Sequence, residues 1–111
     1  MKHKRMPAAR IAFRMQLNPG VKEEYRRRHD EIWPRLVTLL KEAGIEDYSI
    51  FHDEVTGALF AVLKVQDPLN LKTLPGHPVM REWWTHMKDL MQTHEDHEPV
   101  GIPLEEVFHL P

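Results

Sequence analysis

The spacing of apolar residues along this chain changes between the two-residue period of a strand and the three-to-four-residue period of a helix. The order of these changes restricts the fold more than any other feature. Residues 10–17 alternate between apolar and polar side chains, which predicts a first strand. Residues 48–52 and 58–65 are rich in β-branched and aromatic residues, and the turn-forming residues 53–57 between them predict a hairpin. Residues 104–110 are expected to form a short last strand.

Two segments with helical spacing lie between these strands. The first follows a breaker in which Asn18 can cap a helix and Pro19 suits its first turn, and it extends to about Ala43, before Gly44. The second covers residues 80–91, where methionine, tryptophan and leucine recur at helical intervals. Both segments are long enough to cover a sheet.

Pro34 lies inside the first helical segment. Proline lacks an N–H group and its ring clashes with the preceding turn, so it interrupts a helix. We therefore expect two helical pieces that meet near residues 30–34, close to His29.

The resulting order is strand, helix, strand, strand, helix, strand. This order predicts a ferredoxin-like α+β fold, in which an antiparallel sheet carries the helices on one face. A chain of 111 residues has room for one such domain, which we place at residues 10–111 after a flexible leader of residues 1–9.

The second face of such a sheet has no helix to cover it. Strand alternation places Phe51, Phe60 and Val62 on this open face, which is therefore partly apolar. A second copy of the chain, packed sheet to sheet as a homodimer, is the simplest cover. The alternative is that these residues are ordinary surface.

Charge and composition exclude several classes of protein. The net charge of −2 offers no electrostatic attraction for nucleic acid, and no apolar run is long enough for a membrane span. The chain has no cysteine, which fits a reducing compartment, and its first residues lack the apolar core of a signal peptide. We therefore expect a cytoplasmic protein without nucleic-acid or membrane partners.

One apolar stripe on the first helical segment carries two residues suited to chemistry, Tyr25 and His29. Because this stripe faces the sheet, His29 lies at a buried face, where modest changes in its surroundings move its pKa across neutrality. Such a histidine can give and take a proton. The alternative is a core histidine held by a carbonyl or a carboxylate. The stripe consists of Tyr25, His29, Ile32 or Trp33, Leu36, Leu40 and Ala43.

Three further aromatic residues could line a pocket: Tyr48, Trp83 and Trp84. An indole packs well against the apolar C–H face of a sugar ring, and both indole and phenol can bond a hydroxyl. Neighbouring residues on a helix point about 100° apart, so one tryptophan can pack in the core while the other faces a pocket. Each of the three is also explained by core packing alone.

Two runs of charged residues do not predict a functional site. Residues 94–98 contain histidine and carboxylates that could bind a metal, but nothing nearby enforces a geometry, and a solvated acidic loop explains them better. The three arginines of residues 26–28 fan around a helix among acidic neighbours. We expect a solvated face there, with a sugar or salt-bridge role for one arginine.

The residues around His29 also stand in a recognisable order. The chain resembles the L-rhamnose mutarotase family from about Ile11 to Pro111. The string EYRRRHDEIWP is long and therefore far more specific than a short motif. The resemblance rests on residues 24–34 (EYRRRHDEIWP), 44–50, 59–61, 83–84 and 106–108.

The resemblance implies a dimeric ferredoxin-like fold, also described as a dimeric α+β barrel, and an enzyme that interconverts the α and β anomers of L-rhamnopyranose without metal or organic cofactor. It implies that His29 is the proton donor and that Tyr25, Tyr48, Trp83 and Trp84 contact the sugar. Two regions depart from the family pattern: residues 1–9 and the proline-rich residues 67–79.

The chemistry fits these residues. Opening a hemiacetal ring removes the proton of the anomeric hydroxyl and protonates the ring oxygen, for which positioned acid/base help of roughly 10²–10⁴-fold is enough. The complementary base could be a water, Tyr25 or a nearby carboxylate. Two other functions compete: a cofactor-free monooxygenase on the same scaffold, and a sugar-binding or regulatory module without turnover.

Overall fold

The structure is a computed structural model and describes residues 8–111. Most of the expected leader, residues 1–7, lies outside the described residues, while Ala9 is the first residue of a strand and pairs with Val65. The strands are β1 (Ala9–Gln16), β2 (Ile45–His52), β3 (Ala58–Val65) and β4 (Ile102–Leu104). The helices are α1 (Lys22–Asp30), α2 (Pro34–Glu42), α3 (Leu69–Thr73) and α4 (Pro78–Met87), and the short 3₁₀ turns η1 (Leu74–Gly76) and η2 (Lys88–Leu90) follow α3 and α4.

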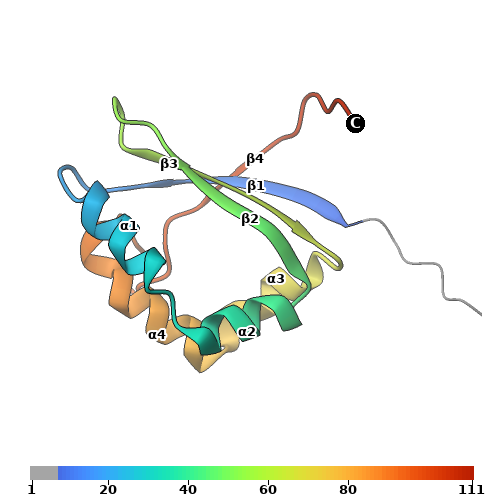
Figure 1. Cartoon of the computed structure of the whole chain (residues 1–111), viewed down its shortest axis with the longest axis horizontal. Helices are drawn as coiled ribbons and strands as arrows, with labels where there is room; N and C mark the ends of the chain where they lie inside the picture. Colours follow the sequence, from blue (N-terminus) through green and yellow to red (C-terminus); the bar gives the residue numbers. More distant parts are fainter. Residues whose placement is uncertain (1–7) are drawn as a thin grey trace, which may run out of the picture.

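The four strands form one antiparallel sheet in the order β2-β3-β1-β4. All four helices lie below this sheet in Figure 1, while above it, within residues 8–111, only the outgoing C-terminal segment is seen. The predicted ferredoxin-like α+β fold, with helices on one face of an antiparallel sheet, is therefore confirmed.

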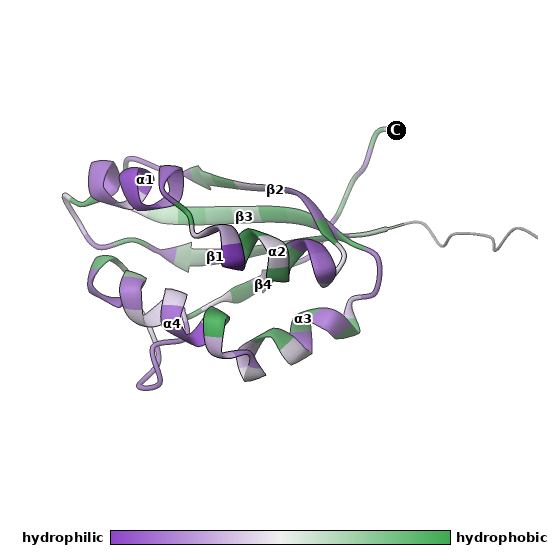
Figure 2. Cartoon of the chain, turned by 60° about the horizontal axis from the view of Figure 1, so that its bottom comes forward, coloured by the Kyte–Doolittle hydropathy of each residue, from purple (hydrophilic) through white to green (hydrophobic). Residues whose placement is uncertain are grey.

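The core lies between the sheet and the helices. Leu59, Ala61, Leu63 and Val65 of β3 are all buried because alternate residues of a central strand face the helices. Leu36 of α2 packs against them with 1% of its surface exposed, and burial of a leucine stabilises the fold by about 1.5–3 kcal/mol. Figure 2 shows the contrast in hydropathy, with mostly hydrophilic residues along α1 and mostly hydrophobic residues along β3.

The break at Pro34 is confirmed. α1 ends at Asp30, and α2 begins with Pro34 as its first residue. Trp33 between them is extended, with φ −65° and ψ 131°, because a residue before proline avoids the helical conformation. The chain therefore turns directly after His29.

The expected cap at Asn18 is wrong. α1 begins at Lys22, and the Asn18 amide instead donates to the main-chain oxygen of Asp89 at 3.1 Å. The main-chain N–H of Asn18 also donates to the carbonyl of Leu90 at 2.8 Å. Contacts with η2 therefore hold this residue away from the helix start.

The strand β2 begins three residues earlier than predicted, at Ile45, because it contains a bulge. The register shifts between Glu46 and Ser49, and Asp47 adopts a φ of 51°. The extra residue changes the alternation, so that Ile45 and Ile50 both face the helices although five positions separate them. Tyr48 shares the helix-facing side with Ile50.

The last part of the chain differs from the expectation. β4 covers Ile102–Leu104, and the predicted strand over residues 104–110 is wrong: residues 105–111 leave the sheet after Leu104 pairs with Ala12. The predicted helix over residues 80–91 is Pro78–Met87 followed by η2. The proline-rich residues 67–79, for which no helix was predicted, contain α3 and η1.

Candidate active site

Tyr25 and His29 lie one helical turn apart on the inner side of α1. Their ring centroids are 4.4 Å apart, and Tyr25 is buried while His29 is half-buried. Trp83 of α4 presents its ring to His29 at a centroid distance of 5.5 Å and an interplanar angle of 83°. Two helices therefore bring an imidazole, a phenol and an indole together beneath the sheet.

The two ring nitrogens of His29 differ. Nδ1 lies 3.0 Å from the main-chain carbonyl oxygen of Tyr25. Because a carbonyl can only accept a hydrogen bond, Nδ1 carries the proton, and Nε2 of the neutral ring holds a lone pair. Burial lowers the pKa of His29 from its ordinary value of 6.5, against weaker opposing effects of this hydrogen bond and of Asp30. The neutral base is therefore the prevailing form at pH 7.

The other polar side-chain atoms of this cluster have no partner in the described part of the chain, yet they are not fully buried. Among residues 8–111, nothing hydrogen-bonds the Tyr25 hydroxyl, His29 Nε2 or Trp83 Nε1. The only fully buried side-chain nitrogen or oxygen without a partner in that part of the chain is His52 Nδ1. The three unbonded atoms of the cluster therefore reach solvent, where a ligand can bond them.

Tyr48 lies near the same cluster. The residue keeps 39% of its surface exposed, yet desolvation around its hydroxyl raises the pKa of Tyr48 to about 12, so the hydroxyl end is the enclosed part of the side chain. Burial raises the pKa of Tyr25, and the Tyr48 phenol adds a smaller electrostatic contribution in the same direction. Both phenols stay protonated at neutral pH and can donate hydrogen bonds.

Trp84 is placed differently from Trp83. Trp83 is 6% exposed and contacts His29, whereas Trp84 is half-buried and lies under the guanidinium of Arg81, 5.4 Å from the ring centroid. Of the residues expected at the site, the structure thus brings Tyr25, His29 and Trp83 together with Tyr48 nearby, and it turns Trp84 toward Arg81.

Two aromatic residues not expected at the site extend the cluster. Trp33 packs edge-on against Trp83 at 5.1 Å, and His86 lies 5.4 Å from Trp33 and 5.5 Å from Trp83. Two sequence signals could have identified them, because Trp33 precedes the helix break and His86 follows Trp83 by three residues, on the same helix face.

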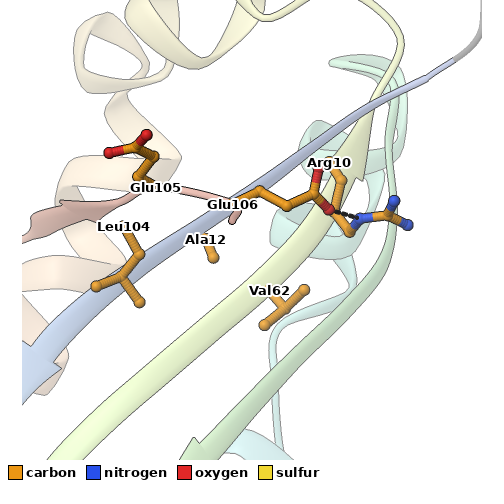
Figure 3. Close-up of a pocket in the computed structure, with 6 residues that line it drawn as sticks. All are labelled: Arg10, Ala12, Val62, Leu104, Glu105 and Glu106. Carbon is orange, nitrogen blue, oxygen red and sulfur yellow. Dashed lines mark hydrogen bonds and ion pairs between the residues drawn. The ribbon is translucent and has the colours of Figure 1, made fainter. Parts of the chain in front are cut away.

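Two hollows lie elsewhere on the molecule. One, of about 140 Å³, is on the open face of the sheet, where Ala12, Val62 and Leu104 form its floor and Arg10 binds Glu106 (Figure 3). The other, of about 260 Å³, lies between α2 and the α3–η1 segment. Neither is lined by the residues predicted to contact the sugar.

The acidic loop of residues 94–98 is held by ordinary side-chain contacts. His97 Nδ1 lies 3.0 Å from the Thr85 hydroxyl, and Asp96 accepts from Arg81 at 3.1 Å. Within residues 8–111, no group of three histidine, aspartate or glutamate side chains is arranged to hold a metal ion. In the same part of the chain, no helix has the length and apolarity needed to cross a bilayer.

The family model and the curated proteins that this chain resembles carry the same description. The family described as L-rhamnose mutarotase matches residues 10–110. An L-rhamnose mutarotase of Sinorhizobium fredii is 61% identical over 101 residues, covering 91% of this chain and 97% of that protein. One of Brucella anthropi is 55% identical and covers 96% of this chain and 100% of that protein.

Solved structures of other proteins are also similar to this chain. The crystal structure of an L-rhamnose mutarotase from Formosa agariphila is 47% identical, has a TM-score of 0.86 and covers 93% of this chain and 99% of that one. A Pseudomonas aeruginosa structure at 13% identity has a TM-score of 0.60 and shares the fold.

Proposed function

The chain belongs to the L-rhamnose mutarotase family, and we propose that one imidazole, that of His29, carries both proton transfers of the reaction. The family's reaction interconverts the α and β anomers of L-rhamnopyranose, and the enzyme is a carbohydrate isomerase. Membership and activity are supported by sequence along nearly the whole chain. The roles of individual residues are the proposal.

The hydrogen bond from His29 Nδ1 to the Tyr25 carbonyl carries this proposal. It leaves Nε2 as a free base that reaches solvent beside the Tyr25 and Trp83 rings. A sugar bound beside these rings meets a proton acceptor on a helix, an aromatic wall and phenol donors.

The proton path needs no second base. Nε2 removes the proton of the anomeric hydroxyl while the bond between C1 and the ring oxygen breaks, and the resulting imidazolium returns the proton to that oxygen. The sugar is then an open-chain aldehyde with a free C5 hydroxyl. After rotation about the C1–C2 bond, Nε2 takes the C5 hydroxyl proton as the ring closes on the other face, and the imidazolium protonates the former carbonyl oxygen. No proton is consumed.

Tyr25 is better suited to donate a hydrogen bond than to act as the complementary base. Burial raises its pKa, so the phenol remains protonated through the cycle. We assign Tyr25, Tyr48 and Trp83 to direct sugar binding, and Trp84, which lies under Arg81, to a lesser part in it. The methyl group at C5 of L-rhamnose has an apolar indole as its natural neighbour.

A homodimer packed through the open sheet face is part of the proposal. This face carries Phe51, which is 62% exposed, with Ile102 at 45% and Leu104 at 40%. The C-terminal segment runs above the same face (Figure 1), and it contains the exposed residues Val107, Phe108 and Leu110. A second copy would bury both sets of apolar side chains.

We further propose that the protein acts in the cytoplasm, which the absence of cysteine fits, and that its partner is a small sugar. Its net charge of −2 gives it no general attraction for nucleic acid.

The test is saturation-transfer NMR between the two anomeric protons of L-rhamnose, with and without protein. The wild-type chain should accelerate the exchange, and His29→Ala should reduce that acceleration by roughly 10²–10⁴-fold while the protein still binds the sugar. L-Fucose, L-mannose and D-glucose measured alongside report the sugar preference.

Two results would contradict the proposal. No acceleration by the wild-type protein at high concentration would favour a binding module. Full acceleration by a folded His29→Ala variant would remove His29 from the chemistry.

A further inference from the structure

The geometry points to Arg28 as a positioning residue that holds the helix carrying Tyr25 and His29 against the segment that follows Trp83. This inference rests on the proposed function, because it concerns the distance between the proton-transferring imidazole and the aromatic wall. Arg28 belongs to the arginine run for which a salt-bridge or sugar role was expected, and the structure gives one of the three arginines an exceptional environment.

Arg28 crosses from α1 to the end of α4. Its Nη1 donates to the main-chain carbonyl of His86 at 2.6 Å and to Oδ1 of Asp89 at 2.8 Å, and its Nη2 donates to Oδ2 of Asp89 at 3.1 Å. Its Nε donates to Glu24 at 2.7 Å, within α1. The guanidinium therefore donates from all three of its nitrogens, and three of the four bonds join segments 58 or 61 residues apart.

Three properties of this contact make it stronger than an ordinary surface ion pair. The Arg28 side chain is only 15% exposed, and a bidentate arginine–carboxylate pair fixes orientation as well as distance. The His86 carbonyl lies in the last turn of α4, where carbonyls generally lack a partner within the helix, and the negative end of the helix attracts the cation. Arg28 thus supplies a hydrogen-bond donor and a positive charge at the C-terminal end of α4.

Asp89, the carboxylate partner of Arg28, lies in a segment that is itself held in place by hydrogen bonds. The Asn18 amide donates to the Asp89 carbonyl at 3.1 Å, and the Asn18 N–H donates to the Leu90 carbonyl at 2.8 Å. Asp89 is therefore anchored to the segment that follows β1. A side chain bound to Asp89 is bound to the sheet framework, not to a mobile loop.

The position of Arg28 links this contact to the site. His29 is the next residue on α1, and Trp83 lies one turn before His86 on α4. The direct contact between the two helices at the site is aromatic, between His29 and Trp83 at 5.5 Å. Among residues 8–111, Arg28 supplies every hydrogen bond between α1 and the α4–η2 segment, so without it packing alone would set their spacing. A misplacement of about 1 Å can cost an enzyme about 10²-fold in rate.

Arg27 supplies a matched control. It also forms ion pairs, to Glu24 at 2.7 Å and to Glu31 at 2.6 Å, but both partners lie within or directly after α1, and its side chain is 56% exposed. Its removal takes away the same charge without releasing α1 from α4.

The experiment measures anomer exchange against sugar concentration for folded Arg28→Ala, Arg28→Lys, Asp89→Ala and the double variant Arg28→Ala/Asp89→Ala. We expect Arg28→Ala to lower kcat about 10- to 100-fold with a much smaller rise in KM, because the chemistry needs a closer placement than binding does. Arg28→Lys should recover part of the loss. Asp89→Ala should resemble Arg28→Ala, and the double variant should be no worse than either.

Arg27→Ala should retain the wild-type kcat. A wild-type kcat in folded Arg28→Ala, or losses that simply multiply in the double variant, would overturn the assignment. If Arg28→Ala does not fold, the kcat of Arg28→Lys decides, since a wild-type value there contradicts a role for the guanidinium. His29→Ala in the same assay separates the two ideas: if it retains exchange, the proposed function fails, and if it alone loses exchange, only the role of Arg28 fails.

Discussion

The Nδ1 nitrogen of His29 lies 3.0 Å from the carbonyl oxygen of Tyr25, one turn earlier on the same helix. This contact determines which imidazole nitrogen carries the proton, and it also fixes the rotation of the ring. Because Nε2 is the nitrogen left free, the resting enzyme offers a base to the sugar, and acid character appears only after the first transfer.

The pH dependence of exchange should follow the neutral form of His29. Burial lowers its pKa below the ordinary value of 6.5, so kcat/KM should fall only when the pH drops below that value. NMR exchange rates measured from pH 4 to 8 (about the range over which histidine titrates) report the midpoint. An acid-side midpoint above 6.5 would contradict the conclusion that burial lowers the pKa of His29.

The same shift predicts a stability effect. As the pH falls below about 6.5, the unfolded chain binds the proton of His29 before the folded chain does, so His29 makes the free energy of unfolding decrease until the lowered folded pKa is reached. Asp30→Asn provides the control, because Asp30 raises the pKa of His29 and its loss should move the midpoint further down.

Tyr25→Phe separates binding from folding. The Tyr25 hydroxyl has no hydrogen-bond partner within residues 8–111, so its removal should change the free energy of unfolding by less than about 0.5 kcal/mol. A lost hydrogen bond to the sugar should raise KM roughly 2- to 10-fold. Urea unfolding and exchange kinetics on the same variant distinguish the two effects. A large stability loss with unchanged KM would make the hydroxyl structural.

The two tryptophans should differ in effect. Trp83 contacts His29, whereas Trp84 lies under Arg81. We expect Trp83→Phe to raise KM about 3- to 10-fold, in line with an aromatic contact of about 0.5–1.5 kcal/mol, and Trp84→Phe to change it by less than about 2-fold. The reverse order would place the sugar on the Arg81 side of α4.

The open sheet face should control the oligomeric state. Phe51→Lys places a charge where a second copy would bury an apolar ring, so this variant should sediment as a monomer while the wild type sediments as a dimer. Val55→Lys is the control, because Val55 lies in the hairpin turn with 93% of its surface exposed and should leave the dimer intact. A monomeric wild type would contradict a dimer through this face.

Much of the fold is predictable because the responsible interactions are local. The β3 range, the hairpin and the break at Pro34 depend on residues that are neighbours in the chain, and all were predicted closely. The start of α1 and the end of β4 were not, because they depend on distant contacts of Asn18 with η2 and on where pairing with β1 stops. The bulge at Asp47, which keeps Ile45 and Ile50 on one face, leaves no clear signal in the pattern either.

For the site, helical spacing alone placed Tyr25 and His29 on one buried face. Residue type marked Tyr48 and the tryptophan pair as pocket candidates, and a family resemblance gave them the sugar contacts. Spacing could not choose between Trp83 and Trp84, or reveal Trp33 and His86, since ring contacts depend on how α1, α2 and α4 pack.

The amino-acid sequence by itself therefore determined the order of elements, the apolar stripe and the reactive residue types, because period and composition act along the chain. Only the tertiary structure decided which His29 nitrogen is free and which arginine reaches the other helix. Both depend on distances of about 3 Å between atoms, and hydrogen bonds are sensitive to geometry at that scale in a way that sequence periodicity is not.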